Sequence, residues 1–271
     1  MNDSKAMKLF YGSALGRGFL NILMKIGLPK AIAAFLCSPL SKPMVGKYIR
    51  KYDIDMDEYP NEKYRSFSDF FVRRKCDPAF DGEPTHLISP CDSMLSFYPI
   101  DEGSCFGIKN SSYRVCDLVG DEALGREYLG GSCLVFRLRP NDYHRYCFID
   151  SGFVGENRFF EGKLHSVQPI ACRKVPVYCL NRRLCTVLET ENFGKVIQTE
   201  VGAMAVGGIV NLFENCHVSK GGEMGRFELC GSTIVLLFQK GKISLLPEYE
   251  RILQNGGELP VRYGEHIGNS I

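Results

Sequence analysis

Short apolar runs that recur between turn-forming residues constrain the fold of this chain more than any other feature. From Leu87 onward the runs are rich in Val, Ile, Leu, Tyr and Phe, and Gly, Asn, Asp and Pro separate them. Such spacing is typical of strands joined by turns. We therefore expect strands at 94–98, 133–138, 175–180, 184–188, 196–201, 209–213, 234–238 and 243–246.

The run at 234–238 is uninterrupted and directly follows Gly231, Ser232 and Thr233. Its length and composition predict a fully buried strand. Gly231 can adopt backbone conformations that other residues cannot, and Ser232 places a hydroxyl beside its carbonyl group. With a base to remove its proton, this hydroxyl could attack that carbonyl. The alternative interpretation is an ordinary turn that leads into a core strand.

The N-terminal residues 7–50 have the pattern of amphipathic helices. Apolar side chains at Phe19, Ile22, Leu23 and Ile26 fall on one helical stripe, and Pro29 ends or kinks that helix. A second short apolar segment covers residues 31–36. We expect residues 1–65 to form a helical segment and 66–271 a largely antiparallel β core, which together make an α+β fold. Residues 112–127 are expected to hold the only helix of the β part.

Charge is distributed unevenly along the chain. Residues 1–51 contain nine Lys or Arg residues and one acidic residue, Asp3, although the whole chain has a net charge of only +2. A basic amphipathic start can lie on an anionic membrane surface, so we expect residues 1–65 to be membrane-proximal. The alternative is that the apolar stripe packs against the rest of the protein. The overall charge does not indicate a nucleic-acid partner.

Twelve cysteines are present, and no two of them form a CxxC pair. Zinc-ribbon and thioredoxin-like sites therefore have no support, and no metal site is predicted. Several cysteines lie inside apolar runs, where they behave as small hydrophobic residues, which favours a reducing compartment. No signal peptide is evident, and no run of about eighteen apolar residues predicts a transmembrane helix.

Polar residues with catalytic potential gather at two places upstream of Ser232. Asp92 follows a Pro-Cys step, and His144 lies among an acid, an arginine and two tyrosines at 142–146. Asp92, His144 and Ser232 could form an acid–base–nucleophile set, although sequence spacing cannot show that they meet. The alternatives are an Asp that hydrogen-bonds its own turn and a structural His.

Two further segments have a distinctive pattern. The aromatic residues Phe67, Phe70 and Phe71 precede three basic residues at 73–75, and we interpret them as a connector that docks a helix end onto the β part. Glycines at 201–208 suggest close approach of the backbone to a strand or ligand. Neither this segment nor the turn-rich residues 220–225 matches a dinucleotide or P-loop motif.

Taken together, these segments resemble the phosphatidylserine decarboxylase family. The resemblance runs in order from about residue 66 to the end of the chain. It is carried by residues 67–74 (FSDFFVRR), 89–92 (SPCD), 139–145 (RPNDYHR), 201–203 (VGA), 206–207 (VG), 220–227 (KGGEMGRF), 231–233 (GST) and 261–265 (VRYGE).

The resemblance implies a self-processing enzyme. In this family the serine attacks the preceding carbonyl, and elimination from the resulting ester leaves a dehydroalanine that hydrolyses to a pyruvoyl group. Here the cut would fall between Gly231 and Ser232, and Ser232 would become the pyruvoyl cofactor. Its ketone condenses with the substrate amine and serves as the electron sink for decarboxylation. The products would be a long chain, 1–231, and a short chain, 232–271.

The resemblance also implies partners and site residues. The substrate would be phosphatidylserine, at the cytoplasmic face of the cell membrane, and a second copy of the chain is a candidate partner. The family uses an Asp, matched by Asp92, and two histidines, of which the first is matched by His144. The position of the second His, usually given the charge-relay role, is Cys147 here. His144 is our choice of base, and the alternatives are another imidazole such as His165 or substitution by Cys147 itself.

Two other classes of protein stay open. One is a degenerate family member that binds lipid but does not cleave itself, which the Cys at position 147 favours and the intact Gly231-Ser232-Thr233 disfavours. The other is a hydrolase that uses Cys147 and His144. Side chains three residues apart on a strand point to opposite faces, which counts against this second class.

Overall fold

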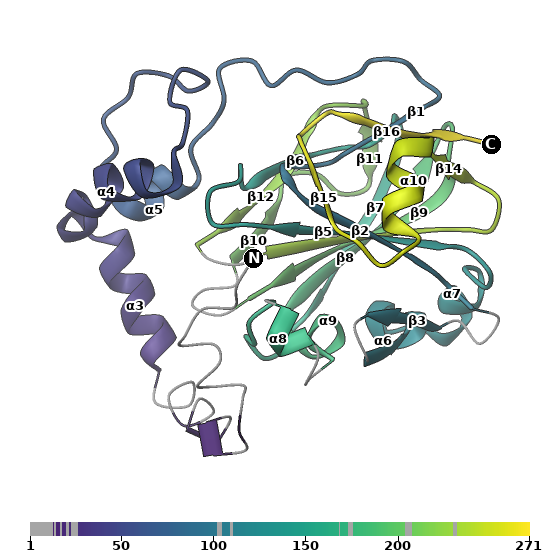
Figure 1. Cartoon of the computed structure of the whole chain (residues 1–271), viewed down its shortest axis with the longest axis horizontal. Coiled ribbons are helices and arrows are strands. Elements are labelled where there is room, and N and C mark those ends of the chain that lie inside the picture. Colours follow the sequence, from purple (N-terminus) through teal and green to yellow (C-terminus); the bar gives the residue numbers. More distant parts are fainter. Residues whose placement is uncertain are drawn as a thin grey trace.

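The computed structural model describes residues 27–101, 105–108, 111–167, 169–172, 176–203, 208–229 and 232–271, together with 13, 15, 16, 18, 19 and 22. In Figure 1 helices from the start of the chain, in purple and blue, lie beside a β core coloured from teal to yellow. The predicted α+β fold is therefore confirmed.

The β core is built on an antiparallel sheet of eight strands. Its order is β11 (Cys216–Val218), β7 (Gly152–Phe160), β8 (Arg183–Thr190), β9 (Gly194–Gly202), β13 (Ser232–Phe238), β5 (Ser132–Leu138), β2 (Ser93–Pro99) and β15 (Leu259–Val261). Both edge strands have three residues, and short edges present few unpaired backbone groups for aggregation.

Strand β13 lies near the middle of this sheet, between β9 and β5. Every residue of β13 is buried, which confirms the prediction for 234–238. Its first residue, Ser232, pairs with Gly202 on one side and Leu138 on the other. The pairing continues to Leu237 on the β9 side and to Phe238 on the β5 side. Ser232 is therefore the first residue of a strand that is fixed along both edges.

The two faces of the sheet pack against different layers. Ile234, Leu236 and Phe238 belong to one hydrophobic cluster, and the alternate residues Val235 and Leu237 belong to another, as the strand period requires. Two small sheets cover the first face. They are β10–β12–β6 (Gly208–Asn211, Glu223–Glu228, Arg145–Cys147) and β1–β16–β14 (His86–Ile88, His266–Ser270, Ile243–Leu245).

Short helices cover the second face of the sheet. Their positions show that two of the sequence-based predictions are wrong. They include α6 (Val115–Val119), α8 (Pro169–Cys172) and α9 (Val177–Leu180), with α7 (Glu122–Arg126) next to α6 and a hairpin of β3 (Cys105–Ile108) and β4 (Ser111–Arg114) before it. The segment 112–127 is thus not the only helical one of the β part, which also contains α10 (Pro247–Leu253). The run at 175–180 is wrong as a strand because residues 177–180 form α9, and short apolar runs do not distinguish a strand from a buried helical turn.

The N-terminal helices have a small core of their own. Helix α3 (Leu28–Cys37), a 3-10 turn (Pro39–Ser41), α4 (Pro43–Tyr52) and α5 (Phe67–Phe71) surround it. We call this core the helical cluster; its buried residues are Leu36, Val45, Phe67, Phe70, Phe71 and, from the β part, Leu229. No helix of the described residues is both long and apolar enough to cross a bilayer.

The predicted apolar stripe is described in part. Phe19 and Ile22 are exposed by 54% and 57%, and Leu23 and Ile26 lie outside the described residues. Exposed apolar side chains of this size are typical of surfaces that bind a membrane or another protein.

A buried carboxyl lies on the same face of the sheet as Ser232. Glu200 pairs with Ile234, two pairs along from Gly202 and Ser232. Its oxygens accept from Gln198 Nε2 (2.8 Å) and Asn211 Nδ2 (3.3 Å), and the Tyr146 hydroxyl donates to Asn211 Oδ1. Burial raises the pKa of Glu200 to about 7, because these amide and backbone hydrogen bonds only partly compensate for lost hydration.

We expect Glu200→Gln to remove part of the pH dependence of stability. The native carboxyl keeps its proton up to about pH 7, whereas the unfolded one loses it near pH 4.5. Its contribution of about 3 kcal/mol is therefore present below pH 4.5 and lost as pH rises to about 7. Urea unfolding between pH 4.5 and 8 measures this, and Glu189→Gln, an exposed residue of β8, is the control. Equal pH dependence in all three proteins would contradict the assignment.

Candidate functional site

The structure brings Ser232 and His144 together, although 88 residues separate them in the sequence. His144 Nδ1 lies 3.1 Å from Ser232 Oγ, and both side chains are buried. His144 immediately precedes β6, and Ser232 begins β13. If Nδ1 is unprotonated, it can accept the hydroxyl proton, which is the relation between a nucleophile and its base.

Two contacts fix the His144 ring in this position. It stacks on Phe71 of α5, with ring centroids 4.1 Å apart, and its backbone carbonyl accepts from Phe227 N. Burial and the nearby Arg73 guanidinium lower the pKa of His144 to about 3, and the carbonyls of Arg139 and Pro140 oppose this shift. The imidazole is therefore neutral at physiological pH and available as a base.

Arg145 anchors α5 next to His144. Its Nε and Nη2 both donate to the carbonyl of Val72, which caps α5, and Nη1 pairs with Glu223. Cations that bind the last carbonyls of a helix stabilise its C-terminal end. The aromatic connector predicted at Phe67, Phe70 and Phe71 thus contacts the β part through Phe71 and through the end of α5. Nothing in the sequence indicated that Phe71 would touch His144.

Asp92 does not take the position that the sequence suggested. Among the described residues it makes no hydrogen bond to His144 or Ser232. Its Oδ1 accepts from Tyr263 N (2.7 Å), and its Oδ2 lies 3.5 Å from Lys75 Nζ. The expected contact between Asp92 and His144 is therefore wrong, because the carboxylate instead ties the turn after β1 to the C-terminal segment.

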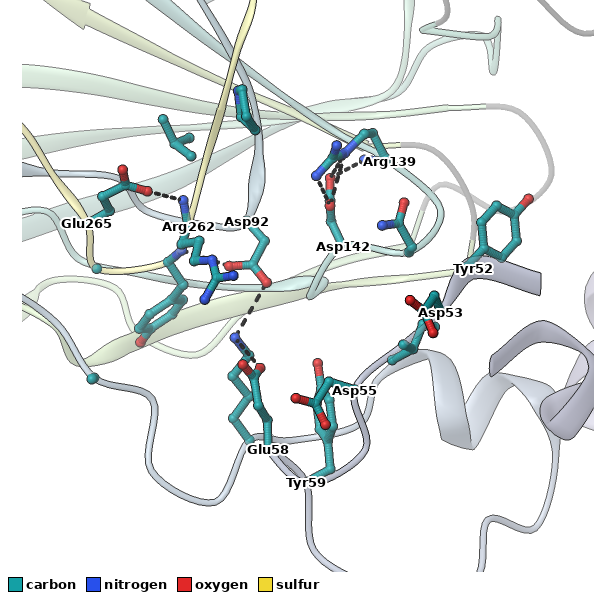
Figure 2. Close-up of a pocket in the computed structure, with 18 of the residues that line it drawn as sticks. Tyr52, Asp53, Asp55, Glu58, Tyr59, Asp92, Arg139, Asp142, Arg262 and Glu265 are labelled. Atoms are coloured by element: carbon teal, nitrogen blue, oxygen red, sulfur yellow. Dashed lines mark hydrogen bonds and ion pairs between the residues drawn. The ribbon is translucent and has the colours of Figure 1, made fainter. Parts of the chain in front are cut away.

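Asp92 lines a hollow of about 750 Å³ that Figure 2 shows. In the figure Arg139 is turned onto Asp142, and the two form an ion pair with Nη2 2.8 Å from Oδ1. Ser232 and His144 are not among the lining residues. The hollow is strongly acidic, with the carboxylates of Asp53, Asp55, Glu58, Asp92, Asp142 and Glu265 against Lys75, Arg139 and Arg262.

Cys147 lies next to the turn that carries Asp92. Its Sγ is 3.6 Å from the carbonyl oxygen of Pro90, and its N donates to the same oxygen. Burial raises the pKa of the Cys147 thiol to about 12. The thiol is therefore protonated at neutral pH, and a protonated thiol is a poor nucleophile. This disfavours the Cys147–His144 hydrolase.

The backbone of His165 is connected through Asn181 to Gly202, the strand partner of Ser232. Asn181 Nδ2 donates to the carbonyls of both His165 and Gly202, each at 2.8 Å, and Gly202 is paired with Ser232. Burial also lowers the pKa of His165. Asn181 thus ties the segment at His165 to the end of β9, a contact that no motif indicated.

The backbone before Ser232 is held by the helical cluster. Gly231 and Cys230 lie outside the described residues, as do residues 204–207. Leu229 is buried in the helical cluster and has φ 46°, the left-handed region that leucine rarely adopts. A strained residue anchored two positions before Gly231 orients the segment that leads to Ser232.

One group of described side chains has metal-ligand chemistry. Asp81, His86 and His266 place ligand atoms within 4.8 Å of one another. The two imidazole rings stack in parallel, however, with centroids 3.7 Å apart and an angle of 3°. Nitrogen lone pairs lie in the ring planes, so this stack does not direct both rings to one ion, and we assign no metal to it.

Comparison with known proteins gives a consistent result. The model of the family described as phosphatidylserine decarboxylase matches residues 67–269. "Phosphatidylserine decarboxylase proenzyme 2" of Clostridium acetobutylicum is 43% identical over 267 residues, which are 97% of this chain and 91% of that protein. "Phosphatidylserine decarboxylase proenzyme" of Clostridium tetani is 38% identical, covering 100% and 94%, and that of Ruminiclostridium cellulolyticum is 36% identical, covering 98% and 92%.

We expect thiol reagents to discriminate among the cysteines. Brief iodoacetamide treatment of the native protein at pH 7.5 should label the exposed Cys37 and Cys76 and leave Cys147 unmodified, because Cys147 is buried and protonated. Peptide mass spectrometry measures each site, and the urea-unfolded protein is the control in which all three react. Rapid labelling of native Cys147 would contradict the buried, neutral thiol.

Proposed function

This chain belongs to the phosphatidylserine decarboxylase family, and we propose that it converts phosphatidylserine to phosphatidylethanolamine after cutting itself between Gly231 and Ser232. One observation carries the proposal: a serine hydroxyl at the start of a buried strand lies 3.1 Å from a neutral imidazole. The relatives are named as proenzymes, which supports a precursor that is processed.

In the proposed cut, Ser232 Oγ attacks the carbonyl carbon of Gly231 while His144 Nδ1 takes the hydroxyl proton. The carbon–oxygen bond of an ester forms as the carbon–nitrogen bond of the peptide breaks, and the proton held by His144 passes to the leaving amine. Loss of the α-proton of residue 232 then breaks its Cβ–Oγ bond, which releases Gly231 as a carboxylate and leaves a dehydroalanine. Water hydrolyses the dehydroalanine to the ketone and ammonia. Strand β13 holds Ser232, and Leu229 in the left-handed region is the last described residue before the proposed cut. The proposed chains are 1–231 and 232–271.

The residues around Ser232 fit a pyruvoyl group at that position. Gly202, paired with Ser232, has no side chain to occupy the space there, and both Ser232 and His144 are buried from water. A ketone at position 232 would supply the electron sink that loss of carbon dioxide from an amino acid requires. His144 would remain beside it to hold or move a proton, and Asn181 and β5 would fix the strand end.

The N-terminal segment supports a membrane location. Large apolar side chains are exposed along its described part: Leu15, Phe19, Ile22, Leu28, Ile32, Phe35, Leu40 and Met44. The same segment is strongly basic. Apolar side chains together with cations are the combination that binds an anionic bilayer surface. We place this segment on the cytoplasmic face of the cell membrane, where it would present the site to a lipid substrate.

His144→Ala should leave the precursor mostly uncleaved, because a positioned base contributes roughly 10²–10⁴-fold to the rate. Cys147→Ser should cleave normally, and Ser232→Ala should remain one chain without activity. The measurement is the fraction of two-chain product against time on a denaturing gel, followed by carbon dioxide release from phosphatidylserine. Added imidazole should fill the space against Phe71 and partly restore cleavage of His144→Ala.

Two further variants test whether His165 is the base and whether Asp92 helps to activate Ser232. His165→Ala blocks cleavage if His165 is the base, and His144→Ala then cleaves but does not turn over substrate. Asp92→Asn stays uncleaved if the carboxylate helps to activate Ser232, and it cleaves if Asp92 only ties Tyr263 to the turn after β1. Normal cleavage of His144→Ala would overturn the assignment of His144 as the base.

Deleting residues 1–30 should weaken binding to anionic vesicles and leave self-cleavage intact, because the helical cluster that contacts Phe71 and Leu229 begins at Leu36. Co-sedimentation with vesicles at low and high salt measures the binding. A control with Phe159→Ser, an exposed apolar residue of β7, should bind as the full chain does. Unchanged binding of the truncated chain would count against the membrane role of this segment.

A further inference from the structure

A second hollow, of about 540 Å³, lies on the outer face of β6 and β12. Three arginines and one glutamate line it, namely Arg74, Arg145, Arg226 and Glu223. Its remaining walls include Phe148, Leu212 and Phe213. The hollow therefore combines an excess of positive charge with an apolar side, and the reaction at Ser232 does not account for either feature.

Two of the arginines keep hydrogen-bond donors available. Arg145 already donates to the carbonyl of Val72 and pairs with Glu223. Arg74 pairs with Glu223 (3.2 Å) and Arg226 with Glu228 (3.3 Å), each through Nη2. Among the described residues, no side chain pairs with Nε or Nη1 of Arg74 or Arg226. A guanidinium with such free N–H groups is suited to phosphate oxygens.

The apolar side of the hollow is exposed to solvent. Leu212 and Phe213 follow β10 and are 46% and 45% exposed, and the Phe213 ring lies 6.1 Å from that of Phe148. A site for a small soluble anion has no need of two large apolar side chains at its rim. A phospholipid at a bilayer surface presents a phosphodiester and, next to it, acyl chains.

We propose that this hollow binds the phosphodiester group of a bilayer phospholipid, with Leu212 and Phe213 at the level of the acyl chains. The proposal rests on the proposed function, because it gives the enzyme a second contact with the membrane that holds its substrate.

The hollow is also continuous with the N-terminal helices. Arg74 follows α5 by three residues, and α5 contacts both α3 and α4. In Figure 1 the β6–β12–β10 sheet lies on the side of the β core nearer to α4 and α5. Helix α5 thus connects α3, with its exposed apolar side chains, to the hollow. This connection is consistent with both surfaces contacting one bilayer.

The test uses the full chain and vesicles of phosphatidylcholine with 30% phosphatidylglycerol. Arg74→Gln/Arg226→Gln should weaken binding by about 30-fold, the effect of two cations near an anionic surface. Leu212→Ser/Phe213→Ser should weaken binding without changing its salt dependence. The matched controls are Arg126→Gln/Arg251→Gln, which removes two charges elsewhere, and Phe159→Ser/Leu180→Ser. Binding equal to that of the controls would overturn the proposal.

Turnover separates this proposal from the proposed function. The arginine variant should cleave itself normally and decarboxylate monomeric dihexanoyl phosphatidylserine at the wild-type rate, while losing about 10-fold or more on phosphatidylserine in bilayers. Inorganic phosphate that binds as tightly as vesicles would identify a free-anion site and overturn the proposal. A wild-type chain that never cleaves but binds vesicles through these residues would refute the proposed function and leave this site standing.

Discussion

The structure depends on the pairing of β13 along both of its edges. Because β9 and β5 fix this strand from Ser232 onward, the hydroxyl of Ser232 has one place in the molecule. The strand supplies alternate side chains to two hydrophobic clusters, so its position is set by packing on both faces as well as by backbone hydrogen bonds. The small sheet β10–β12–β6 on the first face then brings His144, which directly precedes β6, to the hydroxyl of Ser232. A reactive side chain on such a strand is positioned more rigidly than one on a loop.

The helices at the start of the chain take part in this site. Phe71 stacks on His144, and Leu229 is buried among the aromatic residues of the helical cluster. One small core therefore contains both the residue that stacks on His144 and Leu229, which precedes Ser232 by three positions. Arg145 strengthens the link by holding the last carbonyl of α5. Any movement of these helices would be transmitted to the reacting groups through packed side chains.

The sequence predicted the parts of this arrangement that follow from local pattern. The runs at 133–138, 184–188 and 234–238 became strands because length, composition and flanking turn residues agreed there. The run at 175–180 failed because a short apolar stretch carries no periodicity, and burial of Val177 and Tyr178 suits a helical turn equally well. The family motif pointed to Ser232 and His144, but the stack of Phe71 on His144 and the attachment of Asp92 to Tyr263 depend on tertiary packing. Spacing along a chain holds no information on such contacts.

The central position of β13 determines how the protein could refold after it is cut. A cut before Ser232 would leave β13, β14, α10, β15 and β16 in a separate polypeptide of 40 residues, 232–271. In the uncut chain, the effective concentration of these elements is set by the covalent connection; after the cut, denatured pieces would have to find each other by diffusion. The fold would therefore form once, while the precursor is still a single chain. The mature particle would persist because its unfolding is slow, and denaturation would be irreversible in practice.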